Sequence, residues 1–217
     1  MPLQPILPTW LALNGCNDTS ASGQGDRRTG QPVNAGGLNQ GDYFDLTNKE
    51  ALQLSNTATG TLYNGRYRRV QVDSGATAAN VKTGTIGLMP SLAVVGTNIL
   101  GTKNPPMNIV TSYDQAIGNT VGGVRQVVFL NSITPGNYGF VQELGTASVL
   151  GRTTLTAAAP AIGDVIISIA TGVVDDPTQS GSPTYALSKA IVGEAIDLPV
   201  NNALFRFLLQ GGPVVRG

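Results

Sequence analysis

The densest charge in the sequence is a basic run, Arg66-Tyr67-Arg68-Arg69, whose guanidinium groups suit the binding of acidic groups. In a β-strand, Arg66 and Arg68 would share one face, with Tyr67 and Arg69 on the other. Two roles fit this run. It is an edge strand whose positive charge discourages aggregation, or its three arginines contact acidic groups on a partner protein. Three arginines with one tyrosine do not form a platform for stacking bases, so we expect no nucleic-acid partner.

Few residues could perform catalysis. The sequence has no histidine, which excludes Ser-His-Asp and Cys-His machinery and His-ligated metals. Its one cysteine, Cys16, leaves no internal disulfide framework and no Cys-based zinc site. Asp175 and Asp176 could hold calcium, but they precede Pro177 without EF-hand spacing, and a surface turn is the simpler interpretation. Nothing marks a glycosidase pair among the 13 carboxylates. We therefore predict no enzymatic activity, no metal and no cofactor.

The composition indicates a folded chain with an unusually neutral surface. Hydrophobic residues make up 41% of the 217, and charged residues only 12%, about half the usual share. The net charge is zero, which gives no support for attraction to nucleic acid or to an anionic membrane. A surface of Thr, Asn, Ser, Gln and Gly is less costly to desolvate than a charged one. Such a surface fits a protein covered by other subunits, although a neutral soluble protein is the alternative.

No apolar run approaches the roughly 20 residues that a membrane-spanning helix needs. Leu13 to Cys16 loosely resembles a lipoprotein cleavage box. However, no Lys or Arg precedes it, and three prolines interrupt the helix that a signal core would form. We therefore expect no membrane partner.

Residues 1–40 differ from the rest and are predicted to form an extended N-terminal arm. The first 13 residues are apolar and spaced by proline, and a Gly/Asn/Ser/Gln-rich tract follows them. Ordering 13 residues costs about 13–26 kcal/mol, whereas burying their large apolar side chains returns only about 9–18 kcal/mol. We expect the arm to lie on a neighbouring subunit, the alternative being that it packs along its own domain. The arm residues expected to contact a partner are Leu3, Ile6, Leu7, Trp10 and Leu11.

The sequence of residues 41–217 predicts an all-β domain. Short segments rich in Val, Ile, Thr and aromatic residues alternate with Gly, Pro, Asn and Asp turns, which predicts a β-sandwich or β-barrel-like domain of short antiparallel strands. A short helix is plausible where Thr47 and Glu50 have the spacing of a capping box. The predicted strands are 65–72, 85–89, 92–96, 108–113, 123–130, 138–144, 147–152, 164–170, 189–196 and 203–210.

The segment "ITPGNYGFVQELG" (133–145) predicts a β-hairpin. Pro135 presets the first corner of a type II turn, and Gly136 supplies the positive φ that the next position needs. Residues 127–133 would enter the turn and residues 138–144 would leave it. Tyr138, Phe140 and Leu144 would then share one face.

Four segments in this order resemble the head decoration, or capsid cement, proteins of tailed bacteriophages. They are "YRRVQVDSGATAANVKTGTIG" (67–87), "VVFLNSITPGNYGFVQELGTASVL" (127–150), "AIGDVIISI" (161–169) and "IVGEAIDLPVNNALFRFLL" (191–209). The resemblance covers about residues 60–210 and does not include the arm. It implies a β-rich homotrimer or homodimer that binds the major capsid protein on the outer surface of the virion. Such a protein is made in the cytoplasm of the bacterial host.

Two other classes of function remain open at this point. One is a different structural virion component, such as a tail, fibre or baseplate protein. The other is a carbohydrate-binding β-sandwich, for which Trp10 and the six tyrosines would be the stacking residues.

Overall fold

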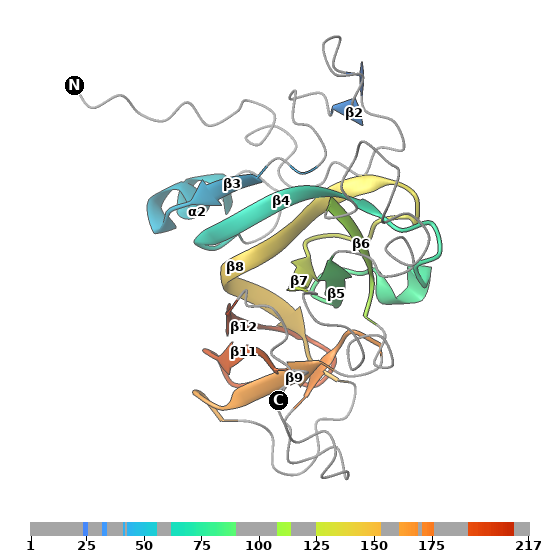
Figure 1. The fold of residues 1–217 in the computed structure, drawn as a ribbon. Helices are drawn as coiled ribbons and strands as arrows, with labels where there is room; N and C mark the ends of the chain where they lie inside the picture. The colour runs from blue at the N-terminus through green and yellow to red at the C-terminus, as the bar shows by residue number, and fades with distance from the viewer. Residues whose placement is uncertain are drawn as a thin grey trace, which may run out of the picture.

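The computed structural model describes residues 24–25, 32–33, 41, 43–55, 62–89, 108–113, 125–152, 161–168, 171–175 and 191–210. Strands dominate these residues, and the predicted all-β class is confirmed (Figure 1). The strands are β1 (Gln24–Gly25), β2 (Pro32–Val33), β3 (Tyr43–Leu46), β4 (Gly65–Val72), β5 (Ile86–Met89), β6 (Ile109–Ser112), β7 (Arg125–Phe129), β8 (Tyr138–Leu150), β9 (Val165–Ser168), β10 (Val174–Asp175), β11 (Ile191–Ala195) and β12 (Leu204–Leu209).

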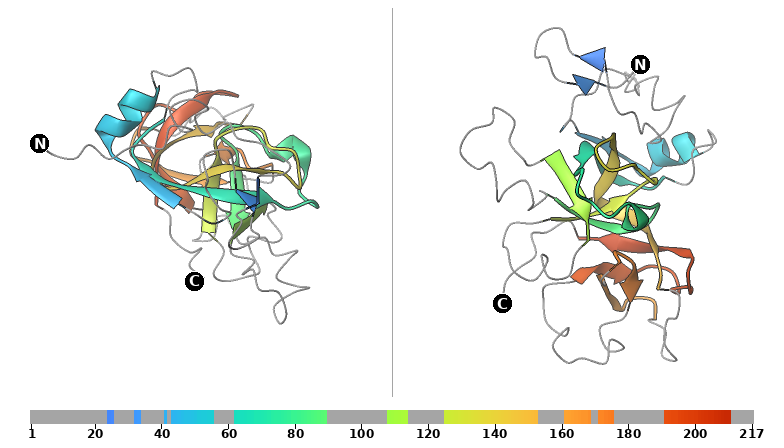
Figure 2. Two further views of the ribbon diagram at one scale, coloured as in Figure 1. Left: turned by 90° about the horizontal axis from the view of Figure 1, so that it is seen from above. Right: turned by 90° about the vertical axis from the view of Figure 1, so that its right-hand side faces the viewer.

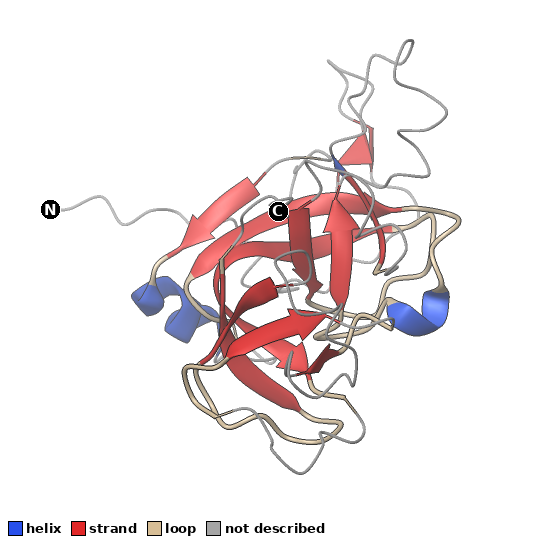
Figure 3. Cartoon of the chain, turned by 60° about the horizontal axis from the view of Figure 1, so that its bottom comes forward, coloured by secondary structure: helices blue, strands red, loops and turns tan. Residues whose placement is uncertain are grey.

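Five strands close into a barrel. The main sheet has the order β10-β9-β11-β12-β8-β7-β5-β6-β4-β3, and an additional pairing of β8 with β4 joins β4, β6, β5, β7 and β8 into a ring. Most neighbours are antiparallel, as predicted, but β4 and β6 run parallel. Figure 3 shows the strands flanked by α2 (Asn48–Ser55) on one side and by the short 3-10 helix Ala78–Asn80 on the other.

Strand β8 links the barrel to a second layer. Its first half pairs with β4 and β7, and its second half pairs with β12, whose other neighbour is β11 (Figure 1). The sequence predicted two strands here, 138–144 and 147–152, but the structure has one of 13 residues. Gly145 lies inside it at φ +96°, where a Cβ would come 2.3 Å from the carbonyl oxygen of Asn64. This glycine therefore permits a close approach of two backbones and does not end the strand.

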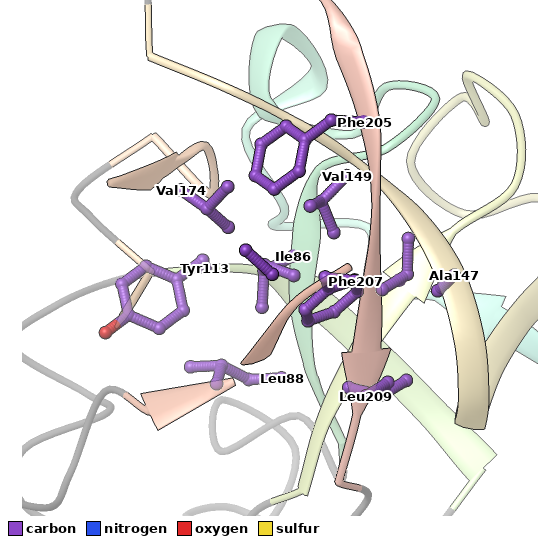
Figure 4. Close-up of a cluster of buried hydrophobic side chains, with 11 residues drawn as sticks. Ile86, Leu88, Tyr113, Ala147, Val149, Val174, Phe205, Phe207 and Leu209 are labelled. Carbon is purple, nitrogen blue, oxygen red and sulfur yellow. The ribbon is translucent and has the colours of Figure 1, made fainter. Parts of the chain in front are cut away.

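Strands β5 and β7 are buried on both faces because they separate two hydrophobic clusters. One face of β7 gives Val127 and Phe129 to the barrel interior. The other gives Val128 to a cluster shared with the second layer, into which Phe205 and Phe207 project from β12 (Figure 4). The members of this cluster are Ile86, Leu88, Tyr113, Val128, Ala147, Val149, Val174, Ala195, Phe205, Phe207 and Leu209.

A third cluster lies between α2 and the barrel, with α2 beside β3 in Figure 2. The predicted capping box begins this helix. The Thr47 N–H donates to Oε2 of Glu50 (2.8 Å), and the Glu50 N–H donates to Oγ1 of Thr47 (3.3 Å). Phe44 of β3 stacks on Tyr67 of β4 with ring centroids 5.4 Å apart. The helix and β3 thus cover one outer face of the barrel.

The predicted turn and the antiparallel pairing of the strands around it are confirmed, but the entering strand ends at Phe129 and does not continue to residue 133. The Asn137 N–H donates to the carbonyl of Thr134 (3.0 Å), and Gly136 has φ +89°, as a type II turn requires. The interpretation of one shared face is wrong at its far end, because Leu144 is exposed whereas Phe140 is buried. The register between β4 and β8 shifts at Arg66/Tyr67, which places one extra residue in β8 before Leu144.

Two further features were not predicted. Within the predicted arm, β1 and β2 form a small two-stranded sheet, seen in blue at the top of the right-hand view in Figure 2. Asp175, expected in a surface turn, is instead buried in β10, where its carboxylate accepts a hydrogen bond from Arg152 (3.1 Å). The predicted strand at 92–96 lies outside the described residues.

Candidate interaction surface

The predicted partner contacts of the arm, at Leu3, Ile6, Leu7, Trp10 and Leu11, all lie outside the described residues. Their role stays a prediction. The basic run lies within the described residues, so its three arginines can be placed.

Arg66 and Arg68 gather around an exposed tyrosine. As predicted, they share one face of β4, and both guanidinium groups lie over the ring of Tyr43, 4.5 Å and 5.3 Å from its centroid. Tyr43 comes from β3, in direct register with Arg68. β3 ends the main sheet, so β4 is not the edge strand there, and the two arginines lie one strand inside it.

Arg66 forms a bidentate ion pair with Asp45. Its Nε donates to Oδ1 (2.8 Å) and its Nη2 to Oδ2 (2.9 Å), with side chains that are 39% and 56% exposed. The hydrogen bonds from Arg66 lower the pKa of Asp45, and the carboxylate raises the pKa of Arg66. The positive charge of Arg66 is therefore already neutralised within the chain.

Arg68 is held more deeply. Its Nε and Nη2 donate to the two carboxylate oxygens of Glu143 in β8, and its Nη1 donates to the carbonyl of Gly41 (2.7 Å). The two side chains are 18% and 5% exposed. This arginine therefore links three parts of the chain: β4, β8 and Gly41, the first residue after the predicted arm.

Arg69 points away from this surface. It is fully buried, and its guanidinium lies over the ring of Tyr138, 4.7 Å from the centroid. Of the three arginines expected to contact a partner, only Arg66 and Arg68 have accessible side chains.

A second exposed area lies on the outer face of β12 and was not predicted. Along this strand Phe205, Phe207 and Leu209 are buried, whereas Leu204, Arg206 and Leu208 are exposed. The segment "LFRFLL" carried a signal that was missed. Alternation gives it apolar residues on both faces, and a strand with two apolar faces has a second surface to cover.

Arg206 at the centre of this face is also paired within the chain. Its Nε and Nη2 each donate to the Asp197 carboxylate at 2.7 Å. These hydrogen bonds lower the pKa of Asp197 and raise that of Arg206. The same arrangement thus occurs twice on the described surface: a neutral Arg–Asp pair beside exposed apolar side chains.

Two kinds of feature are absent from the described residues. No group of three or more His, Cys, Asp or Glu side chains there could hold a metal ion. No helix in the same residues is long and apolar enough to cross a membrane.

Comparison with known proteins gives a structural likeness. No protein-family model and no curated protein matches the chain. Among solved structures, the chain is similar to the N base of the head fibre protein gp8.5 of bacteriophage phi29, with a TM-score of 0.39 and 10% sequence identity. The match covers 69% of this chain and 98% of that chain. These values do not assign the chain to a family.

Proposed function

We propose that this chain is a structural virion protein that binds the outer surface of an assembled phage capsid and cements neighbouring capsid subunits. It acts as a homo-oligomer against the major capsid protein, with residues 1–40 reaching a neighbouring subunit. The proposal assigns no catalytic step, metal, cofactor, nucleic acid or membrane to the chain.

One observation carries the proposal. The described surface joins exposed apolar side chains to arginines whose charge an aspartate of the same chain already neutralises, at Arg66–Asp45 and at Arg206–Asp197. Such a surface adheres by shape and apolar contact and has little net field with which to capture a charged small molecule. The ordered resemblance of residues 60–210 to capsid cement proteins supplies the setting.

The proposed mechanism needs only binding. A protein that binds the assembled lattice and not free subunits stabilises the lattice by mass action. Many weak contacts per particle then add through multivalency.

The test uses heads of the parent phage that lack this protein. The purified chain should cosediment with expanded heads, not with unexpanded ones, and should raise their rupture temperature. Deleting residues 1–40 should weaken both effects. An Arg125→Ala variant is the matched surface control, because Arg125 is exposed at the start of β7 and outside the two areas described above. A chain that leaves expanded heads unbound at saturating concentration is not a cement protein.

The other two classes predict different results. A tail, fibre or baseplate component would copurify with headless tails. A carbohydrate-binding domain would bind glycans as an isolated chain, but few described tyrosines could stack on a sugar. Tyr67, Tyr113 and Tyr138 are buried, and two guanidinium groups lie over the exposed ring of Tyr43.

A further inference from the structure

We propose that the outer face of β12 and the second half of β8 is a two-fold dimer interface, occupied by a second copy of this chain. The inference deepens the proposed function by naming the surface through which the chain self-associates. Its test uses purified protein without heads, so that its failure and failure of capsid binding are distinguishable.

The first argument is the pattern of exposed residues. Leu204 and Leu208 are 47% and 43% exposed and stand two residues to either side of Arg206, in the palindromic sequence "LFRFL". Because alternate strand residues share a face, these three side chains form a row with two-fold symmetry about Arg206. A symmetric row can meet itself in an isologous contact, whereas an unrelated partner has no need of the symmetry.

The register of the sheet fixes where the axis lies. Arg206 is paired across the sheet with Ser148 of β8, while Leu204 and Leu208 are paired with Leu150 and Thr146. An axis parallel to the line from Arg206 to Ser148, and midway between the two facing sheets, reverses the strand direction and places one face on the other. Arg206 of one copy then lies opposite Arg206 of its partner, each paired with its own Asp197. Leu204 of one copy then meets Leu208 of its partner, and Ser148 meets itself.

Charge complementarity favours a second copy as the occupant. The only cation of the row, Arg206, is held by both oxygens of Asp197. The neighbouring row on β8, in the same sheet, consists of the uncharged residues Thr146, Ser148 and Leu150. A strongly acidic or basic partner would have to break the Arg206–Asp197 pair or bury charge against it, which is costly. In the two-fold arrangement each arginine brings its own aspartate to the axis. Glu194 of β11, which is exposed and in register with Leu208, lies on the strand beside this face and keeps its charge outside the two-strand contact.

The area of this face sets the affinity that we expect for the dimer. Two strands about 4.8 Å apart and six residues long give a footprint of about 10 Å by 20 Å. This is smaller than the roughly 800 Å² per partner of standard interfaces. The dimer should therefore be reversible, with a dissociation constant in the micromolar range or weaker.

The test is sedimentation velocity on the full chain between about 1 and 100 μM. Wild-type protein should shift from monomer to dimer over this range. The double variant Leu204→Glu/Leu208→Glu should remain monomeric, with the dissociation constant raised at least about 100-fold. The matched control is Leu52→Glu, which changes an exposed leucine on α2 and should dimerise like wild type. Circular dichroism and the urea midpoint should show that both variants fold.

Cross-linking tests the axis itself. In a Cys16→Ser background, Ser148→Cys should cross-link to its own copy with a short bismaleimide, because facing sheets pack about 10 Å apart, beyond the reach of a disulfide. Leu52→Cys should not cross-link under the same conditions. The proposal is overturned by a wild-type monomer throughout the range, by a trimer, by self-association that survives the double glutamate variant, or by a Ser148→Cys protein that dimerises without cross-linking. Loss of head binding in a glutamate variant of a monomeric chain would assign the face to the capsid protein.

Discussion

The two ion pairs of β4 should differ sharply in their contribution to stability. Arg66–Asp45 is bidentate but exposed, whereas Arg68–Glu143 is mostly buried. The perturbation is a pair of isosteric substitutions, Asp45→Asn and Glu143→Gln. Each removes one negative charge and leaves the shape of the side chain almost unchanged.

The magnitudes follow from burial. An exposed ion pair contributes about 0.2–1 kcal/mol, so Asp45→Asn should cost less than 1 kcal/mol. Breaking a buried pair costs about 3–5 kcal/mol because the partner charge is left buried. Arg68 keeps its bond to the Gly41 carbonyl and is 18% exposed, which reduces the expected cost of Glu143→Gln to about 2–3 kcal/mol. In a domain of this size the difference corresponds to roughly 4–8 °C in Tm.

Urea unfolding at pH 7 measures both costs, and salt separates their causes. At about 1 M salt the Debye length is only about 3 Å, so the small cost of Asp45→Asn should shrink while that of Glu143→Gln persists. The double variant Arg68→Met/Glu143→Leu should recover to within about 1 kcal/mol of wild type, since apolar groups can replace a buried ion pair. Equal losses from the two single variants, or equal responses to salt, would refute the reasoning.

Three further outcomes are expected. Thr47→Ala should lower the free energy of unfolding by about 1 kcal/mol in urea titrations, because it removes the hydroxyl that accepts from the Glu50 N–H. Gly136→Ala should cost about 1–2 kcal/mol in the same assay through backbone strain alone, since φ is +89° and a Cβ there would meet nothing within 4 Å. The pKa values of Asp45 and Asp197 are lowered in the fold, so both carboxylates stabilise it above the unfolded pKa of about 3.9, and this stabilisation is lost as the pH falls through their lowered pKa values. Wild type should therefore lose more stability than Asp45→Asn and Asp197→Asn between pH 5 and the acid limit, as measured by urea midpoints.

The sequence predicted the features that depend on neighbouring residues. Strand β4 has the predicted bounds, the capping box begins α2, and the Pro135-Gly136 turn joins β7 to β8. Each of these is set within a few residues by alternation, by a side-chain cap or by one positive φ.

Features that depend on contacts between distant parts of the backbone could not be predicted from neighbouring residues. Glycine can adopt a positive φ and has no Cβ. At Gly136 this permits a turn, whereas at Gly145 it permits the close approach of the Asn64 backbone, and only the tertiary structure distinguishes the two roles. Strand β10 has two residues, too few for a periodic signal. The parallel pairing of β4 with β6 likewise has no local signature.

The arginine run shows that side-chain partners from distant parts of the sequence could not be predicted either. Its alternation placed Arg66 and Arg68 on one face, but not their partners. Asp45 lies 21 residues away in the sequence and Glu143 lies 75 residues away. The arginines were therefore interpreted as available for a partner protein, whereas the fold had already paired both. The pairing of Arg206 with Asp197 was easier to predict, because the two residues are only nine positions apart in the sequence.

Local charge pairing also constrains how such a surface can bind. At Arg66–Asp45 and Arg206–Asp197 the charge is cancelled at the site, and not only in the sum over the chain. A partner that approaches these areas meets dipoles and leucine side chains, so long-range steering contributes little and the fit of exposed side chains must supply the specificity. Each such contact is weak, because the apolar area involved is small. Useful affinity then requires many copies bound side by side, and a repeating lattice of subunits provides that arrangement.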